Sequence, residues 1–112
     1  MNFSPLVRFL GQWGGYRLAQ SLTARQPRML MYHRFTSAQS DQRVTGVSAK
    51  SFEQQVAHIA RHYHPMTVSE MIRGCFEGEK LPKHAIAITV DDGYEDFYHI
   101  AWPILKRHKV PA

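Results

Sequence analysis

Residues 85–94 read Ala-Ile-Ala-Ile-Thr-Val-Asp-Asp-Gly-Tyr, an uncharged, partly β-branched run that ends in two carboxylates and a glycine. Six residues without a charge are typical of a strand that is buried on both faces, as in a parallel sheet. Helix-forming residues follow Tyr94, so the stretch predicts a strand–loop–helix unit. In such α/β units, chemistry collects at the carboxyl ends of the strands, which is where Asp91 and Asp92 stand.

The two adjacent carboxylates can divide the work of a hydrolytic site. One can hold a divalent cation while the other accepts a proton from water. Gly93 lets the chain turn sharply and lets a ligand approach the backbone. Asp-Asp-Gly is also ordinary turn chemistry, and Asp-Gly can close a β-hairpin. No alternating strand follows Gly93, which disfavours a hairpin, but a plain turn stays open as the alternative.

A second short strand is predicted at residues 29–33, and we expect it to be buried. His33 stands at its carboxyl end, which is the same end as Asp91 if the two strands are parallel. A single histidine is more often structural than functional, so both roles stay open. The polar residues 36–50 show no periodicity and predict a loop that borders the substrate groove.

Apolar residues at helical spacing predict helices between and after these strands. Ser51 begins one helix, with Gln54 completing a capping box. Thr67 and Glu70 repeat that device for a second helix. The first helix is expected to bury Phe52, Val56, Ile59, Ala60 and Tyr63, and the second carries Met71, Ile72, Cys75 and Phe76. A short strand at residues 64–66 and a helix around Pro103 complete an order that favours a parallel α/β architecture.

The first residues predict a different kind of segment. Residues 3–24 have the pattern of two short amphipathic helices, with a break at Gly14-Gly15. This segment is either a packing arm or an interfacial anchor in which Phe9 and Trp13 meet a bilayer surface. No stretch of about 18 apolar residues suggests a transmembrane helix, and a cleavable signal is unconvincing. A cytoplasmic or membrane-peripheral location therefore stays open.

Composition narrows the possible partners. The chain has 112 residues, 44% of them hydrophobic, and a formal net charge of +5. This charge suits an anionic partner such as phospholipid headgroups or an anionic glycan, and it also suits plain solubility. The Lys and Arg residues are spread out, without the basic runs and interleaved aromatics of nucleic-acid binders, so we expect no nucleic-acid partner. Cys75 is the single cysteine, which excludes an internal disulfide.

Several stretches together resemble one known family. Residues 89–94, Thr-Val-Asp-Asp-Gly-Tyr, are similar to the first motif of the polysaccharide deacetylases (NodB-homology, carbohydrate esterase 4 family), which usually reads Thr-Phe-Asp-Asp-Gly. Val90 in place of the aromatic residue is a mild departure. Residues 29–34 resemble the first strand of the family, and residues 110–112 resemble the approach to its next strand. The helix after the motif also matches, at Asp96, Tyr98, Ala101, Pro103, Ile104 and Leu105.

The resemblance implies a metal-dependent deacetylase that acts on an N-acetylated glycan. Asp91 would be the catalytic general base and Asp92 a ligand of a divalent metal, with zinc the first choice. His33, Gly93 and Tyr94 would form the rim of the site. The family completes its metal site with a histidine pair of the type His-x-x-x-His. No such pair follows the motif here, so the remaining ligands are expected beyond the 112 residues.

The implied fold is α/β, the incomplete amino-terminal part of a (β/α) barrel, preceded by short amphipathic helices. Residues 1–25 would form the helical segment, and residues 26–112 the first part of a deacetylase domain truncated before the later motifs. Such a barrel needs about 200 residues or more, so we expect this piece alone to be inactive. The open alternative is a non-enzymatic basic module that associates with membranes or glycans, or a degenerate remnant.

Overall fold

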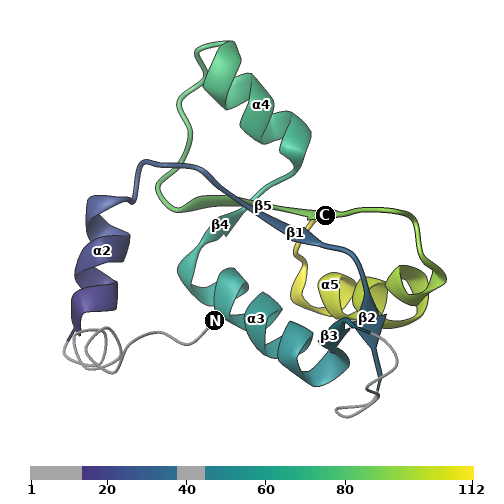
Figure 1. The fold of residues 1–112 in the computed structure, drawn as a ribbon. Helices are drawn as coiled ribbons and strands as arrows, with labels where there is room; N and C mark the ends of the chain where they lie inside the picture. The colour runs from purple at the N-terminus through teal and green to yellow at the C-terminus, as the bar shows by residue number, and fades with distance from the viewer. Residues whose placement is uncertain (1–13, 38–44) are drawn as a thin grey trace.

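The structure is a computed structural model that describes residues 14–37 and 45–112 (Figure 1). Helices and short strands alternate along the described chain. The elements, in order, are α2 (Tyr16–Leu22), β1 (Arg28–Tyr32), β2 (Phe35–Thr36), β3 (Val47–Ser48), α3 (Ala49–His62), β4 (His64–Pro65), α4 (Val68–Phe76), β5 (Ala85–Val90), the π-helical turn η2 (Phe97–Ala101) and α5 (Trp102–His108).

Strand β5 is the centre of a three-stranded parallel sheet, as its sequence predicted. The strand order is β1-β5-β4, and both neighbours run parallel to β5. Leu30 is paired with Ile88 and Tyr32 with Val90, so β1 and β5 reach their carboxyl ends together. The parallel α/β architecture and the short strand after α3 are therefore confirmed.

The side chains of β5 alternate between two separate apolar clusters. Ile86 and Ile88 point into the larger cluster with residues of α3 and α5, whereas Ala85 and Ala87 pack against Met71 of α4. Figure 1 shows α3 and α5 on one side of the sheet and α4 on the other. All four residues are buried, which confirms the prediction of a strand covered on both faces.

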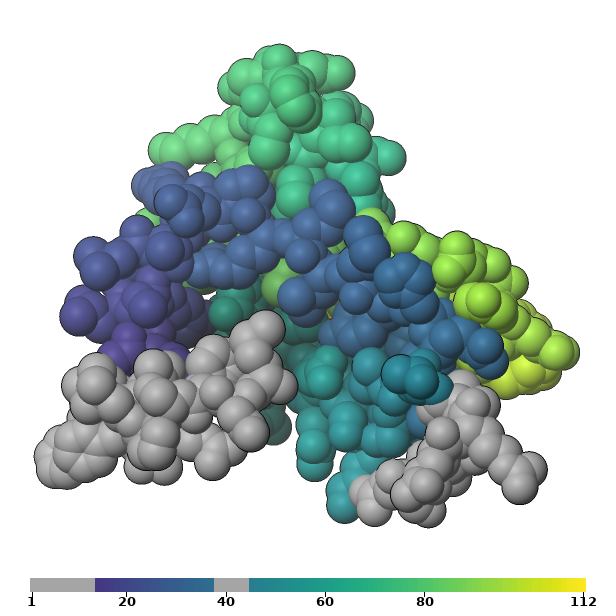
Figure 2. All heavy atoms as spheres, in the orientation of Figure 1, coloured from purple at the N-terminus to yellow at the C-terminus, as the bar shows by residue number. Residues whose placement is uncertain are grey.

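Strand β1 is not buried in the same way, which corrects our expectation. Leu30 and Tyr32 face the larger cluster, but Met29 and Met31 remain 51% and 62% exposed. The reason is that β1 lies at the edge of the sheet, and α4 covers only the alanines of β5. Figure 2 shows β1 on the surface of this view, with α4 above it.

Helix α3 begins three residues earlier than its capping pattern predicted. Ser48 is the residue that caps it, because its side chain accepts a hydrogen bond from the backbone N–H of Ser51. Phe52, Val56 and Ile59 are buried as expected, but Ala60 is exposed.

Helix α4 begins where predicted, but it buries less than predicted. Thr67 and Glu70 form the reciprocal capping box. Of its apolar residues only Met71 is buried, while Ile72 and Phe76 are exposed, as is Cys75. The small alanines of β5 offer this helix a narrow contact surface, which explains the short buried stripe.

The segment between β1 and α3 is not a plain loop. Residues 35–36 and 47–48 pair as two short parallel strands, β2 and β3. A Cβ on Gly46 would lie 2.8 Å from the carbonyl oxygen of Arg34, so only glycine allows this close approach. Residues 38–44 of the expected loop lie outside the described residues.

At the amino terminus, the second of the two predicted helices is observed. It is α2, and none of its residues is buried. The first predicted helix, at residues 3–13, lies outside the described residues. Within the described part of the chain, no helix combines the length and apolar character that a membrane crossing requires.

Candidate active site at the carboxyl ends of the strands

The parallel pairing of β1 and β5 brings His33 and Asp91 together. The backbone N–H of Asp91 donates to the carbonyl oxygen of Tyr32 at 2.9 Å, which extends the ladder by one residue. The first residue after each strand, His33 after β1 and Asp91 after β5, then lies at the same edge of the sheet. His33 Nε2 is 3.8 Å from Asp91 Oδ2, and the two side chains are 50% and 41% exposed. The expectation that His33 lies beside Asp91 is confirmed.

Asp92 and Gly93 turn the chain away from the strand. Both have left-handed backbone angles, with φ of 70° at Asp92 and 62° at Gly93. Glycine adopts this conformation freely, whereas an aspartate there carries a conformational cost, tolerated because its short side chain fits. Strained residues of this kind gather at functional sites. The turn is followed by the helical residues of η2 and α5, so Asp-Asp-Gly does not close a hairpin.

An ion pair crosses the rim immediately beside these residues. Arg34 Nε donates to Asp96 Oδ2 at 2.7 Å, and the Asp96 carboxylate is mostly buried. The guanidinium carbon of Arg34 also lies 4.1 Å from the centre of the Tyr94 ring, which is a cation–π contact. The hydrogen bond to Asp96 raises the pKa of Arg34 above its ordinary value. This pair fixes the loop after β1 to the helix after β5.

The sequence had singled out neither Arg34 nor Asp96 as a site residue. A signal was present, because an arginine and an aspartate each follow a strand predicted to end at the same edge of the sheet. Thr89 adds a further polar group near this edge. Among the described residues, Thr89 Oγ1 and the second carboxylate oxygen of Asp96 are buried without a hydrogen-bond partner.

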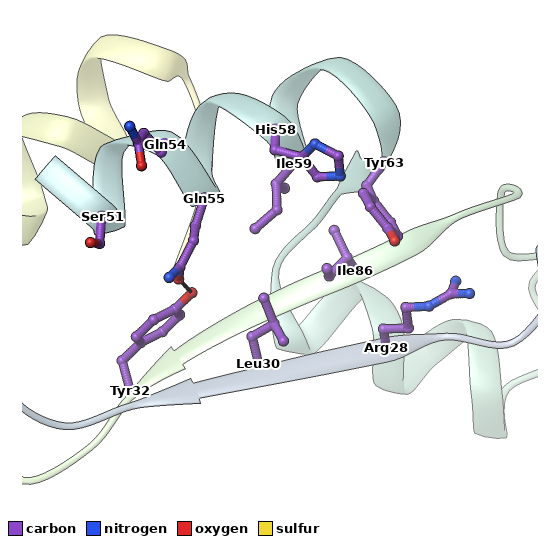
Figure 3. Close-up of a pocket in the computed structure, with 10 residues that line it drawn as sticks. All are labelled: Arg28, Leu30, Tyr32, Ser51, Gln54, Gln55, His58, Ile59, Tyr63 and Ile86. Atoms are coloured by element: carbon purple, nitrogen blue, oxygen red, sulfur yellow. Dashed lines mark hydrogen bonds between the residues drawn. The ribbon is translucent and has the colours of Figure 1, made fainter. Parts of the chain in front are cut away.

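A groove between the sheet and α3 is distinct from this rim. Figure 3 shows its lining, in which Leu30 and Ile86 point from the sheet toward Ile59 of α3. Its volume is about 640 Å³, and neither Asp91 nor Asp92 lines it. At one end, the Tyr32 hydroxyl donates to Gln55 Oε1 at 2.6 Å, and burial raises the pKa of Tyr32.

Known proteins that are similar to this chain in sequence and in fold include several deacetylases. The chain is 30% identical over 100 residues to a poly-β-1,6-N-acetyl-D-glucosamine N-deacetylase of Escherichia coli (strain K12), and 34% identical over 79 residues to one of Staphylococcus aureus (strain MSSA476). The solved structure of the Streptococcus pyogenes deacetylase PplD in complex with acetate superposes with a TM-score of 0.65 at 28% identity. Over the aligned region, the chain is therefore similar in sequence and in fold to polysaccharide deacetylases. No model of a protein family matches it.

The match to these deacetylases covers most of this chain and a minor part of each relative. It includes 83% of the chain but 15% of the E. coli protein, and 70% of the chain but 27% of the S. aureus protein. The S. pyogenes structure is matched over 76% of this chain and 39% of its own length. The likeness to these deacetylases therefore applies to the aligned region alone.

A metal site of a polysaccharide deacetylase would need more ligands than this rim provides. Zinc sites in proteins use three or four side chains. The rim offers suitable donor types in Asp91, Asp92 and His33. However, residues 14–37 and 45–112 contain no group of three or more His, Cys, Asp or Glu side chains placed to hold one ion. The described residues do not by themselves form a complete metal site.

Proposed function

We propose that this chain supplies the first catalytic residues of an enzyme that removes acetyl groups from an N-acetylated glycan. The observation that carries the proposal is the placement of Asp91, at the carboxyl end of the central strand and 3.8 Å from His33. In a chain that is similar to polysaccharide deacetylases, this is where the reacting groups of an α/β fold gather.

In this proposal Asp91 is the general base. Its carboxylate is about two-fifths exposed, so water and substrate can reach it. The His33 imidazole lies beside it, with Nε2 3.8 Å from Asp91 Oδ2. A general base contributes typically about 10²–10⁴-fold to a reaction rate. Gly93 and Tyr94 complete the rim, and the stacking of Arg34 on the Tyr94 ring keeps that ring in place.

Asp92 is proposed as the ligand of a divalent metal, with zinc as the first choice. The left-handed turn separates its carboxylate from the ladder of β5 and leaves it exposed. A bound metal would supply Lewis-acid activation of water and of the acetyl carbonyl. Because the described residues provide too few ligands, further ligands are proposed to come from beyond residue 112. By itself, the chain of residues 1–112 is then inactive.

The wider architecture is also a proposal. The three parallel strands fit the beginning of a (β/α) barrel, with residues 26–112 as its first part and residues 1–25 as a separate helical segment. A peripheral membrane contact through residues 3–24 is supported by Leu18 and Leu22 of α2, which are exposed although they are apolar.

The test measures the release of acetate from a β-1,6-linked N-acetylglucosamine oligomer by the full-length gene product. The Asp91→Asn variant should lose the activity, because an amide cannot accept the proton. Glu79→Gln is the matched control, since it also replaces an exposed carboxylate by an amide but lies in the loop before β5. No acetate release by the unaltered protein would favour the non-enzymatic alternative, in which Asp-Asp-Gly is only a turn.

A further inference from the structure

A second pocket lies at the opposite end of the sheet from Asp91. It has a volume of about 670 Å³ and is formed by α2, the last turn of α3 and the residues before β5. His84 immediately precedes β5, whereas Asp91 follows it. Six residues of strand separate the two positions, or about 20 Å at 3.3 Å per residue. Ligand binding here would not compete with chemistry at the rim.

The lining of this pocket is strongly basic. Four permanently charged side chains and two histidines line it, and no aspartate or glutamate does. The six residues are Arg17, Arg25, Arg61, His62, Lys83 and His84. Among the described residues, none of the four cations makes an ion pair. Like charges that share a pocket repel one another, so an anion bound between them would be stabilised.

Helix capping explains only part of this cluster. Arg61 and His62 lie in the last turn of α3, where cations commonly complement the helix dipole. Arg17, Arg25 and Lys83 come from three other segments, and no helix end accounts for their convergence. Gln20 and Ser21 add polar groups from the same side of α2 as Arg17.

The backbone at the base of the pocket is fixed in a strained conformation. His84 has a φ of 58°, which is rare for a residue other than glycine. Its N–H donates to the carbonyl oxygen of Ala24 at 2.7 Å, and its own carbonyl accepts from the N–H of His64 at 2.9 Å. These bonds tie the turn after α2 to the start of β5 and to β4. Within the described residues, His84 Nδ1 is buried without a hydrogen-bond partner.

We propose that this pocket binds a phosphate group. Arginine guanidinium groups match the geometry of phosphate oxygens and bind them with paired hydrogen bonds, and a lysine adds a point charge. The phosphate can belong to a free phosphate compound or to an anionic phospholipid headgroup. Leu18 and Leu22 are exposed on α2 beside the pocket, an arrangement that suits a headgroup with its lipid surface.

The first experiment follows amide resonances of the 112-residue protein while inorganic phosphate is added. Saturable shifts at the pocket residues are expected. The double variant Arg61→Gln/Lys83→Gln should weaken binding about tenfold or more, because two charge-assisted bonds are lost. The control Lys50→Gln/Arg73→Gln removes the same charge from exposed positions outside the pocket and should bind as the unaltered protein does. Absence of saturable shifts, or equal weakening in both variants, would overturn the proposal.

The second experiment identifies the source of the phosphate with vesicles of phosphatidylglycerol. Retention on the vesicles that the pocket variant loses and the control keeps assigns the site to lipid headgroups. Saturable binding of inorganic phosphate without retention on vesicles assigns it to a free phosphate compound. Retention that both variants keep to the same degree would show a general charge effect and would contradict a role of the pocket at membranes.

Discussion

The aromatic ring of Phe52 on α3 supports the chain segment that carries His33 and Arg34. Phe52 is 0% exposed, and it packs edge-on against Tyr32, with ring centres 5.0 Å apart, and against Phe35, with centres 4.7 Å apart. Tyr32 directly precedes His33, and Phe35 directly follows Arg34. Replacing Phe52 should therefore loosen the fold and displace the rim together.

The size of the effect follows from these contacts. An edge-to-face aromatic pair contributes about 0.5–1.5 kcal/mol beyond the burial of its area, so the two pairs contribute about 1–3 kcal/mol. Leucine fills much of the same space, and Phe52→Leu should lower the free energy of unfolding by about that amount. Phe52→Ala adds a cavity and should cost about 3–5 kcal/mol, a large part of the 5–15 kcal/mol typical of a domain.

Urea unfolding followed by circular dichroism measures these losses, and the imidazole resonances of His33 report the position of the rim. Phe76 provides the control, because it is 84% exposed on α4 and its replacement by leucine should change stability by less than about 0.5 kcal/mol. The imidazole signals should shift in Phe52→Leu and stay unchanged in Phe76→Leu. Equal loss of stability in the two variants would refute the assignment of the core.

Three further predictions test other parts of the structure. Thr67→Ala removes the cap of α4 and should lower the unfolding free energy by about 1 kcal/mol; an unchanged urea midpoint would contradict the cap. The hydrogen bond from His108, helped by Arg107, lowers the pKa of Glu53 below its ordinary value of 4.5. The stabilisation from the ionised Glu53 carboxylate is therefore complete above that value and is lost as the pH falls below it. In Glu53→Gln, the melting temperature should depend less on pH in the acid range than it does in the unaltered protein. Calorimetry of residues 1–112 should show weak zinc binding or none, and tight one-to-one binding that Asp92→Ala abolishes would reveal overlooked ligands.

The sequence was sufficient to predict the central strand and the start of α4, because these depend on local patterns. The uncharged run before Asp91 predicted β5 and its burial, and the Thr67–Glu70 pattern predicted the start of α4. The position of His33 beside Asp91 followed from parallel pairing alone. The first two features are set by residues close together in the chain, whereas the third needs only the parallel direction of β1 and β5.

Other features depend on contacts that the chain makes only when folded. The exposure of Met29 and Met31 follows from the edge position of β1, which no local pattern encodes. The start of α3 moved to Ser48 because β3 pairs with β2 and places that residue at the helix end. The Arg34–Asp96 ion pair joins residues 62 positions apart. Such pairs become visible only when the strand order is known.

The division of roles between Asp91 and Asp92 is the central claim, and metal content measured beside acetate release tests it most directly. In the protein as its own gene encodes it, Asp91→Asn should keep nearly all of its metal and lose deacetylation, because only the proton acceptor is removed. Asp92→Asn should lose metal and activity together, because a neutral amide holds a cation less strongly than a carboxylate does. A metal site emptied by Asp91→Asn would contradict the account, since both carboxylates would then be ligands.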